Sequence, residues 1–232
     1  MNACARCEVR DTAICRSLDE REVDELNRFG RQKCLRRGEV LQWEGDESLL
    51  IGNVIEGVVK LSASTRQGKD QTLGVAYAGD FIGRPFGARA DQTVTALSDA
   101  RVCVFRRADF DAFARRHPEL EHDLLQRTLG ELDNARAWML LLGQMDAGER
   151  VASFLVQIAR RQSGGAPRQP DGAVVLDLPF GRQDIADLLG LTIETVSRQI
   201  TALRRAGLID TPRLRTIVIR DLDALSACAD GE

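Results

Sequence analysis

Residues 184–209 show a hydrophobic pattern that predicts two short amphipathic helices joined by a tight turn. Gly190 can adopt the left-handed conformation that ends a helix, and Thr192 belongs to the residue types that cap the start of the next one. The apolar side chains of the first helix are Ile185, Ala186, Leu188 and Leu189, and those of the second are Val196, Ile200 and Leu203. The pattern is typical of a helix-turn-helix.

The polar face of the second predicted helix carries side chains suited to reading base edges. An Arg can bind guanine with two hydrogen bonds, a Glu accepts from cytosine, and a hydroxyl pairs with either kind of group. The predicted DNA-binding residues are Thr192, Glu194, Ser197, Arg198, Thr201, Arg204 and Arg205. The alternative to a DNA-binding motif is an ordinary helical hairpin whose polar face is only solvated. The glycine-started turn and the short strands expected at 208–209 and 214–219, which form a wing, favour double-stranded DNA as the partner.

The rest of the chain divides into three further segments. A short helix is expected at 19–29. Between residues 33 and 105, nine glycines from Gly38 to Gly87 separate short runs of Val, Ile and Leu, a pattern that indicates an antiparallel barrel or sandwich. A long helix from Pro118 to about Met145 follows, and then a helix at 148–161, a loop at 162–172 and a strand at 174–178. The fold class is therefore α+β.

The long helix carries an apolar stripe that is interrupted at Arg136. A stripe of this length on a linking helix predicts a homodimer seam more often than burial within one chain. Its members are Leu125, Leu129, Leu132, Met139 and Leu142. The expected organisation is a cysteine-bearing head at 1–17, a sensor domain at 18–114, a dimerisation helix at 115–146 and a winged helix-turn-helix domain at 147–232.

Composition adds limits on location and chemistry. The 232 residues contain no apolar run of eighteen and start with no secretory signal, so we expect a cytoplasmic protein with no membrane partner. The net charge of −3 does not indicate nucleic-acid binding, but residues 149–220 hold eleven Arg against seven acids. A disulfide framework for the six cysteines is not expected in a reducing compartment.

Three cysteines lie close together at the start of the chain. Cys4, Cys7 and Cys15 follow the pattern C-x2-C-x7-C. With a fourth thiolate from elsewhere they would suit an iron–sulfur cluster or zinc, although structural zinc usually takes two C-x2-C pairs and this segment has one. A flexible head with incidental thiols is an alternative. An electron-transfer or disulfide-exchange protein is another, but it would leave the helix-turn-helix without a role.

In the order of its parts, nearly the whole chain resembles the Crp/Fnr superfamily of transcription regulators. The resemblance is strongest at GDFIG (79–83), at the Glu149–Arg150 pair and at TIETVSR (192–198). It implies a non-enzymatic homodimer in which a cyclic-nucleotide-binding-like β-roll controls two recognition helices through the long helix, with RNA polymerase as a further partner.

Two signals used in this superfamily do not match the residues. Cyclic-nucleotide binders have a Glu after GDFIG and an Arg-Ser pair further on, where this chain has Arg84 and Gln92–Thr93. A buried phosphate would lack its cation, so a cyclic nucleotide is not expected. Haem ligation is not expected either, because His117 and His122 are interpreted as solvated residues at the start of a helix.

The resemblance instead points to the oxygen-sensing Fnr-type branch, in which a fourth Cys lies in the strand before the dimer helix. Cys103 occupies that position. The implied cofactor is an oxygen-labile [4Fe–4S] cluster, and the alternative is thiol-redox or nitric-oxide sensing without a stable cluster. Cys34 and Cys228 match no ligand position, and Cys34 is interpreted as packing. The Glu-x-x-Ser-Arg arrangement at 194–198 implies TTGAT-like palindromic sites.

Overall fold

The computed structural model describes residues 4–47, 50–68, 70–87, 89–162 and 172–231. The chain forms two compact units, Met1–Asp133 and Asn134–Glu232. The division falls within the long helix α3 (Pro118–Gln144), which therefore contributes its first half to one unit and its second half to the other. The predicted long helix is confirmed to within a residue.

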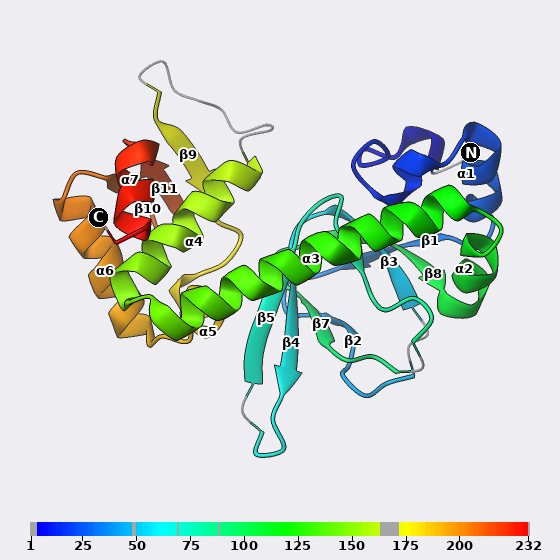
Figure 1. Ribbon diagram of the computed structural model, residues 1–232, viewed down its shortest axis with the longest axis horizontal. Coiled ribbons are helices and arrows are strands. Elements are labelled where there is room, and N and C mark those ends of the chain that lie inside the picture. Colours follow the sequence, from blue (N-terminus) through cyan, green and yellow to red (C-terminus); the bar gives the residue numbers. More distant parts are fainter. Residues whose placement is uncertain (1–3, 48–49, 69, 88, 163–171, 232) are drawn as a thin grey trace. The chain divides into compact units, whose positions relative to one another are not determined.

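The first unit contains two four-stranded antiparallel sheets that make a β-roll, shown in Figure 1. This confirms the antiparallel barrel or sandwich expected from the glycine-separated strands. One sheet has the order β1-β8-β3-β6, formed by Arg31–Leu35, Ala100–Arg106, Leu50–Glu56 and Phe81–Ile82. The other has the order β2-β7-β4-β5, formed by Val40–Gln42, Thr93–Ala96, Val59–Ser64 and Asp70–Ala76.

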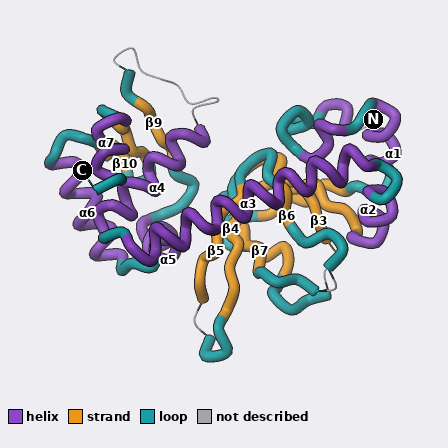
Figure 2. Tube along the Cα trace, in the orientation of Figure 1, coloured by secondary structure: helices purple, strands orange, loops and turns teal. Residues whose placement is uncertain are grey.

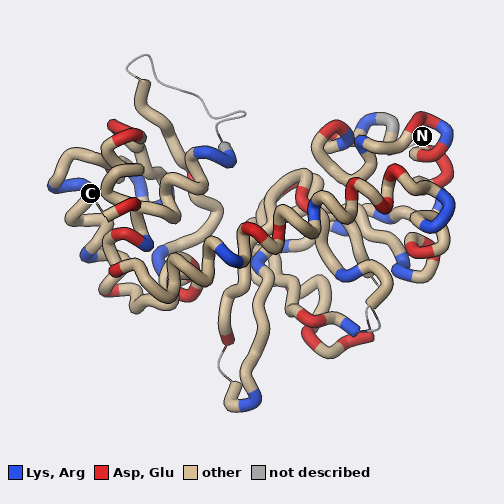
Figure 3. Tube along the Cα trace, in the orientation of Figure 1, with Lys and Arg blue, Asp and Glu red and all other residues tan. Residues whose placement is uncertain are grey.

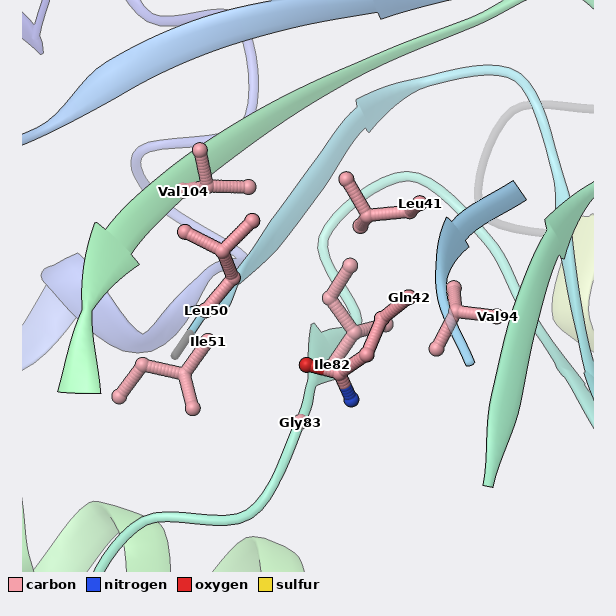
Figure 4. Close-up of a pocket in the computed structure, with 8 residues that line it drawn as sticks. All are labelled: Leu41, Gln42, Leu50, Ile51, Ile82, Gly83, Val94 and Val104. Carbon is pink, nitrogen blue, oxygen red and sulfur yellow. The ribbon is translucent and has the colours of Figure 1, made fainter. Parts of the chain in front are cut away.

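The interior of the β-roll is filled by apolar side chains from both sheets. Figure 4 shows Leu41, Ile82 and Val94 converging with Leu50 and Val104. The space between them is about 10 Å³, which is at the lower limit for a single water molecule. A ligand chamber is therefore not located between these residues.

Strand β8 has two different faces because successive side chains alternate across a strand. Val102 and Val104 point into the β-roll core. Cys103 and Phe105 point to the opposite face, where Phe105 packs with residues of the N-terminal segment and of helices α1 (Glu20–Asn27) and α2 (Arg107–Ala114). This outer face of the β1-β8-β3-β6 sheet is the surface on which the N-terminal segment lies.

Residues 4–17, called the head below, are folded against that sheet. They form two short 3₁₀ helices, η1 (Cys4–Arg6) and η2 (Ile14–Ser17). Ile14 is completely buried and its backbone N–H makes a long hydrogen bond of 3.5 Å to the buried Asn53 on β3. The head is thus part of the core of the first unit, which argues against the alternative of a flexible head with incidental thiols.

The second unit consists mainly of helices with one small sheet, as Figure 2 shows. Its helices are α4 (Ala147–Gln162), α5 (Arg182–Leu189), α6 (Ile193–Arg205) and α7 (Leu222–Ala229). The sheet has the order β10-β11-β9, with bounds Ile209–Arg213, Thr216–Ile219 and Val174–Asp177. The predicted helices, strand and wing are confirmed, whereas α7 and α2 were not predicted. Residues 163–171 of the predicted loop lie outside the described residues.

Among the described residues, no helix is both long and apolar enough to cross a membrane.

Candidate functional site

The helix-turn-helix forms as the local sequence predicts. Helix α5 ends at Gly190, whose φ of +62° lies in the left-handed region, and the Thr192 side chain accepts a hydrogen bond from the backbone of Thr195 at 3.2 Å to cap α6. The apolar stripe of α6 is buried, with Val196, Ile200 and Leu203 at most 6 % exposed. Burial of this stripe fixes which face of α6 remains available to a ligand.

The opposite face of α6 presents a carboxylate and a guanidinium one helical turn apart. Glu194 and Arg198 are exposed, and Arg198 donates to the Thr195 hydroxyl at 3.3 Å. Hydrogen bonds from its own backbone N–H and from the Thr192 hydroxyl lower the pKa of Glu194, so at neutral pH it is a charged acceptor. Ser197 is half-buried. The Thr201 hydroxyl donates its proton to the Ser197 backbone carbonyl at 2.8 Å.

Basic side chains surround this face. Arg204 and Arg205 are exposed at the end of α6, and Arg213 and Arg215 are exposed on the wing. Arg182 at the start of α5 was not predicted as a DNA-binding residue. Its pKa is lowered by burial and by the charge of Arg204, and its Nη1 is buried without a hydrogen-bond partner among the described residues. Two guanidinium groups that repel each other favour an anion such as a DNA phosphate between them.

Four cysteines meet between the head and β8. Cys4 lies in η1, Cys15 in η2 and Cys103 in β8, and all three pack against the apolar core around Ile14. Cys7 and Cys103 also contact the smaller cluster of Val9, Ala13 and Ile55. The structure therefore brings together the four cysteines that the resemblance singled out, although Cys103 is 88 residues from Cys15 in the sequence.

These thiols influence one another electrostatically. Burial raises the pKa of Cys15 to about 12, and repulsion from Cys4 and Cys7 adds to the effect. The pKa of Cys103 is also raised to about 12, first by burial and then by repulsion from Cys4, Cys15 and Cys7. The pKa of Cys4 is raised by burial and by Cys7 and Asp24. Without a cation between them, the buried thiols stay protonated at neutral pH.

The remaining two cysteines lie elsewhere. Cys34 is exposed on β1, opposite Arg101 of β8, so its interpretation as a packing residue is wrong. Strand β1 is at the edge of its sheet and four of its five side chains are exposed, which explains the difference. Cys228 is half-buried in α7 of the second unit.

The donor chemistry at the four cysteines fits an iron–sulfur cluster. The ligands are thiols only, the surroundings are apolar, and a cationic centre would offset the repulsion that raises their pKa values. The described residues contain no group of three or more His, Cys, Asp or Glu side chains placed to hold a single metal ion.

The histidines take no part in this site. His122 is exposed, as predicted, but the expectation of a solvated His117 is wrong. The His117 side chain is only 13 % exposed, its ring stacks on Phe113, and its Nδ1 lies 2.9 Å from the Glu22 carboxylate. His117 packs α1 against the start of α3, a contact between segments distant in sequence.

A larger cavity of about 630 Å³ lies beside GDFIG, lined in part by Arg84, Asp91, Gln92, Arg127 and Leu125. Its two cations are already paired. Arg84 is largely exposed and bonds Asp91 at 3.4 Å, and Arg127 bonds the Asp123 carboxylate at 3.0 Å. A cyclic phosphate in this cavity would have to compete with these carboxylates for either guanidinium. The expectation that no cyclic nucleotide binds stays a prediction.

Comparison with known proteins matches both units. A family model of the Crp-like helix-turn-helix domain matches residues 149–228, and one of the cyclic nucleotide-binding domain matches residues 32–117. The chain is 37 % identical to the transcriptional activator protein FnrL of Cereibacter sphaeroides, over 97 % of this chain and 91 % of that protein. It is 31 % identical to the fumarate and nitrate reduction regulatory protein of Salmonella typhimurium, over 97 % and 90 %.

A solved structure has the same architecture. FixK2 from Bradyrhizobium japonicum superposes with a TM-score of 0.78 at 30 % identity, covering 86 % of this chain and 96 % of that one.

Proposed function

The chain belongs to the Crp/Fnr family of DNA-binding transcription regulators, and on this premise we propose that it is a homodimeric activator controlled by an oxygen-labile [4Fe–4S] cluster. The observation that carries the proposal is the meeting of Cys4, Cys7, Cys15 and Cys103 in one apolar site. The likeness to proteins named as a transcriptional activator and a fumarate and nitrate reduction regulator supports the same reading. As an activator, the protein would recruit RNA polymerase.

The acid–base state of the thiols favours a cluster over a thiol-redox sensor. A cysteine that reacts directly with oxidants needs a low pKa and access to solvent. Burial and mutual repulsion instead raise the pKa of Cys15 and Cys103 to about 12, so both thiols are protonated at neutral pH. These groups are poor nucleophiles when free, but they become good ligands when a metal centre supplies compensating positive charge.

When bound, an iron–sulfur cluster would supply an oxygen-labile link between the head and β8. The chain's own residues supply the rest of the site: β8 fixes Cys103, the bond from Ile14 to Asn53 holds η2 on the sheet, and Val9 and Ile55 exclude water. Because ligation requires loss of the thiol protons, we expect cluster binding to strengthen as pH rises.

Purification without air tests the proposal directly. We expect a brown protein with a broad absorbance shoulder near 400 nm and about four iron and four acid-labile sulfide ions per chain, by the composition of a [4Fe–4S] cluster. Exposure to air should remove the shoulder and weaken DNA binding together. A colourless protein that contains no iron and binds DNA equally with and without oxygen would refute the cluster and leave the DNA-binding assignment in place.

The sequence read by α6 follows from its exposed pair. We expect two TTGAT-like half-sites on consecutive major-groove turns, roughly 10 base pairs apart, with Arg198 on the guanine, Glu194 on the complementary strand and Ser197 at the outer thymine. Arg198→Ala should cost about 1–3 kcal/mol on the TTGAT site and abolish the preference for guanine at that position.

Binding to DNA with single-base changes, at fixed salt concentration, measures this effect. Arg205→Ala is the matched control, because an exposed Arg at the end of α6 is suited to phosphate contact and should weaken binding to every sequence equally. Selection from random DNA that returned TGTGA half-sites would contradict the assignment.

A further inference from the structure

A buried carboxylate joins the head to the long helix. Asp123 of α3 has a side chain only 8 % exposed, and each of its oxygens has its own guanidinium partner. Arg16 of η2 donates to Oδ1 from Nη2 at 2.6 Å and from Nε at 3.1 Å. Arg127 of α3 donates from Nε to Oδ2 at 3.0 Å. Arg16 directly follows Cys15, so this ion pair begins beside a thiol of the candidate cluster site.

Arg127 extends the same network to the backbone of two other segments. It donates from Nη2 to the carbonyl of Thr12 at 2.6 Å and from Nη1 to the carbonyl of Gly79 at 3.3 Å. Gly79 has a φ of +92°, and a β-carbon there would come 2.8 Å from the Thr12 hydroxyl. The head therefore approaches the GDFIG turn so closely that only glycine fits, and Arg127 binds both carbonyls at this point.

The network holds one side of α3 while the apolar stripe occupies the other. A helix turns about 100° per residue, so Asp123 and Arg127 lie on the side of α3 opposite Leu125 and Leu129. Leu120 and Leu124, next to the network, are buried, whereas Leu125, Leu129 and Leu132 are 44–55 % exposed. In Figure 1 the start of α3 lies near the head, and acidic and basic residues are mixed along both head and helix in Figure 3.

We propose that Arg16, Asp123 and Arg127 form a clamp through which the position of the head controls the dimer seam of α3. This inference rests on the proposed function, which supplies both the signal that moves the head and the dimer seam that responds. With the head seated, Thr12 and Arg16 hold Arg127 and Asp123 and fix the rotation of α3 on the β-roll. When the head leaves, Asp123 keeps Arg127 but loses Arg16, and Arg127 loses the Thr12 carbonyl, so the buried carboxylate is left with one guanidinium partner in place of two. The first turns of α3 then loosen, and the stripe no longer meets its copy in register.

Asp123→Asn tests the clamp, because an amide offers one acceptor oxygen and no charge to two guanidinium groups. In protein prepared without air, we expect the iron content to stay at the wild-type value. The dimer dissociation constant, measured by sedimentation, should rise at least tenfold, and backbone hydrogen exchange should accelerate in both 4–17 and 118–128. Arg16→Gln should reproduce the effect. The double variant Arg16→Gln, Asp123→Asn should have a dimer dissociation constant no higher than that of either single variant, as expected for residues that act as a unit.

Arg101→Gln is the matched control. Arg101 ties the head to the β-roll through Glu8 at 3.1 Å and also bonds Glu56 at 3.3 Å, but these are exposed pairs that do not involve α3. Its loss should leave the dimer constant unchanged. If Asp123→Asn accelerates exchange in the head and leaves both the dimer constant and residues 118–128 as in the wild type, the clamp does not transmit and the inference is wrong.

The clamp and the cluster fail in different ways. If the wild-type protein prepared without air contains no iron, the cluster is refuted. The dimer constants and exchange rates of the variants and of the iron-free wild type would then still show whether the clamp acts on the seam. If Asp123→Asn fails to fold, Arg16→Gln and Arg127→Lys carry the test, since both keep the buried carboxylate. Arg16→Gln removes one of its two guanidinium partners, and Arg127→Lys replaces the other by an ammonium that cannot make the same three hydrogen bonds.

Discussion

Cys103→Ser is expected to yield a protein that retains its fold but contains no iron and binds DNA equally weakly with and without air. Serine nearly keeps the size of the side chain on β8 and replaces the proposed ligand that β8 contributes to the site. Three thiolates from one short segment would then remain, and nothing would link the head to β8 through a metal centre. Iron and sulfide content, the absorbance near 400 nm and DNA affinity without air measure the result together.

The other cysteines provide matched comparisons. Cys4→Ser, Cys7→Ser and Cys15→Ser should each have the same effect as Cys103→Ser, because each removes one corner of the ligand set. Cys34→Ser and Cys228→Ser should retain full iron content, since one side chain is exposed on an edge strand and the other lies in the second unit. Loss of iron in Cys34→Ser together with its retention in Cys103→Ser would show that the fourth ligand is misassigned.

The DNA-binding half of the molecule could be predicted because its signals are local. Gly190 ends a helix, Thr192 starts the next, and the stripe of α6 repeats within eight residues, so each feature needs only its sequence neighbours. The short helices α2 and α7 were missed because each has eight residues, about two turns, in which a period is hard to see. Helix α5 is as short, but it was recognised by its place in the helix-turn-helix and by Gly190 at its end.

The first unit depends on contacts between residues that are distant in the sequence, which no local pattern contains. The bond from Ile14 to Asn53 spans 39 residues and the pair Arg16–Asp123 spans 107, so the seating of the head follows from the tertiary fold alone. The i, i+4 spacing of Asp123 and Arg127 was visible in the sequence, but such pairs are common on solvated helix faces. Cys34 and His117 were misjudged for the same reason, since their exposure is set by an edge position and by a ring contact to Phe113.

The apolar stripe of α3 is left open by the fold of one chain, which is why a partner is proposed for it. Leu125, Leu129 and Leu132 are 55, 47 and 44 % exposed, and Met139 is 74 % exposed. Leu142 differs from them: it is half-buried and lies near Gly190 within the second unit, on another side of the helix. The proposed seam is therefore centred on the first four residues.

Leu132→Asp is expected to convert the protein to a monomer at micromolar concentration and to lower its affinity for a palindromic site by at least a hundredfold. In a two-fold dimer the seam contacts its own copy, so one substitution places two carboxylates together in an apolar interface. A monomer binds each half-site separately and loses the effective concentration that joins the two binding events. Sedimentation and DNA titration measure the two effects.

Leu73→Asp, at a leucine of similar exposure on β5, is the matched control and should change neither the dimer nor the DNA affinity. If Leu132→Asp stayed a dimer at that concentration, the two chains must associate through another surface, because a buried pair of like charges without compensation could not be tolerated at the seam.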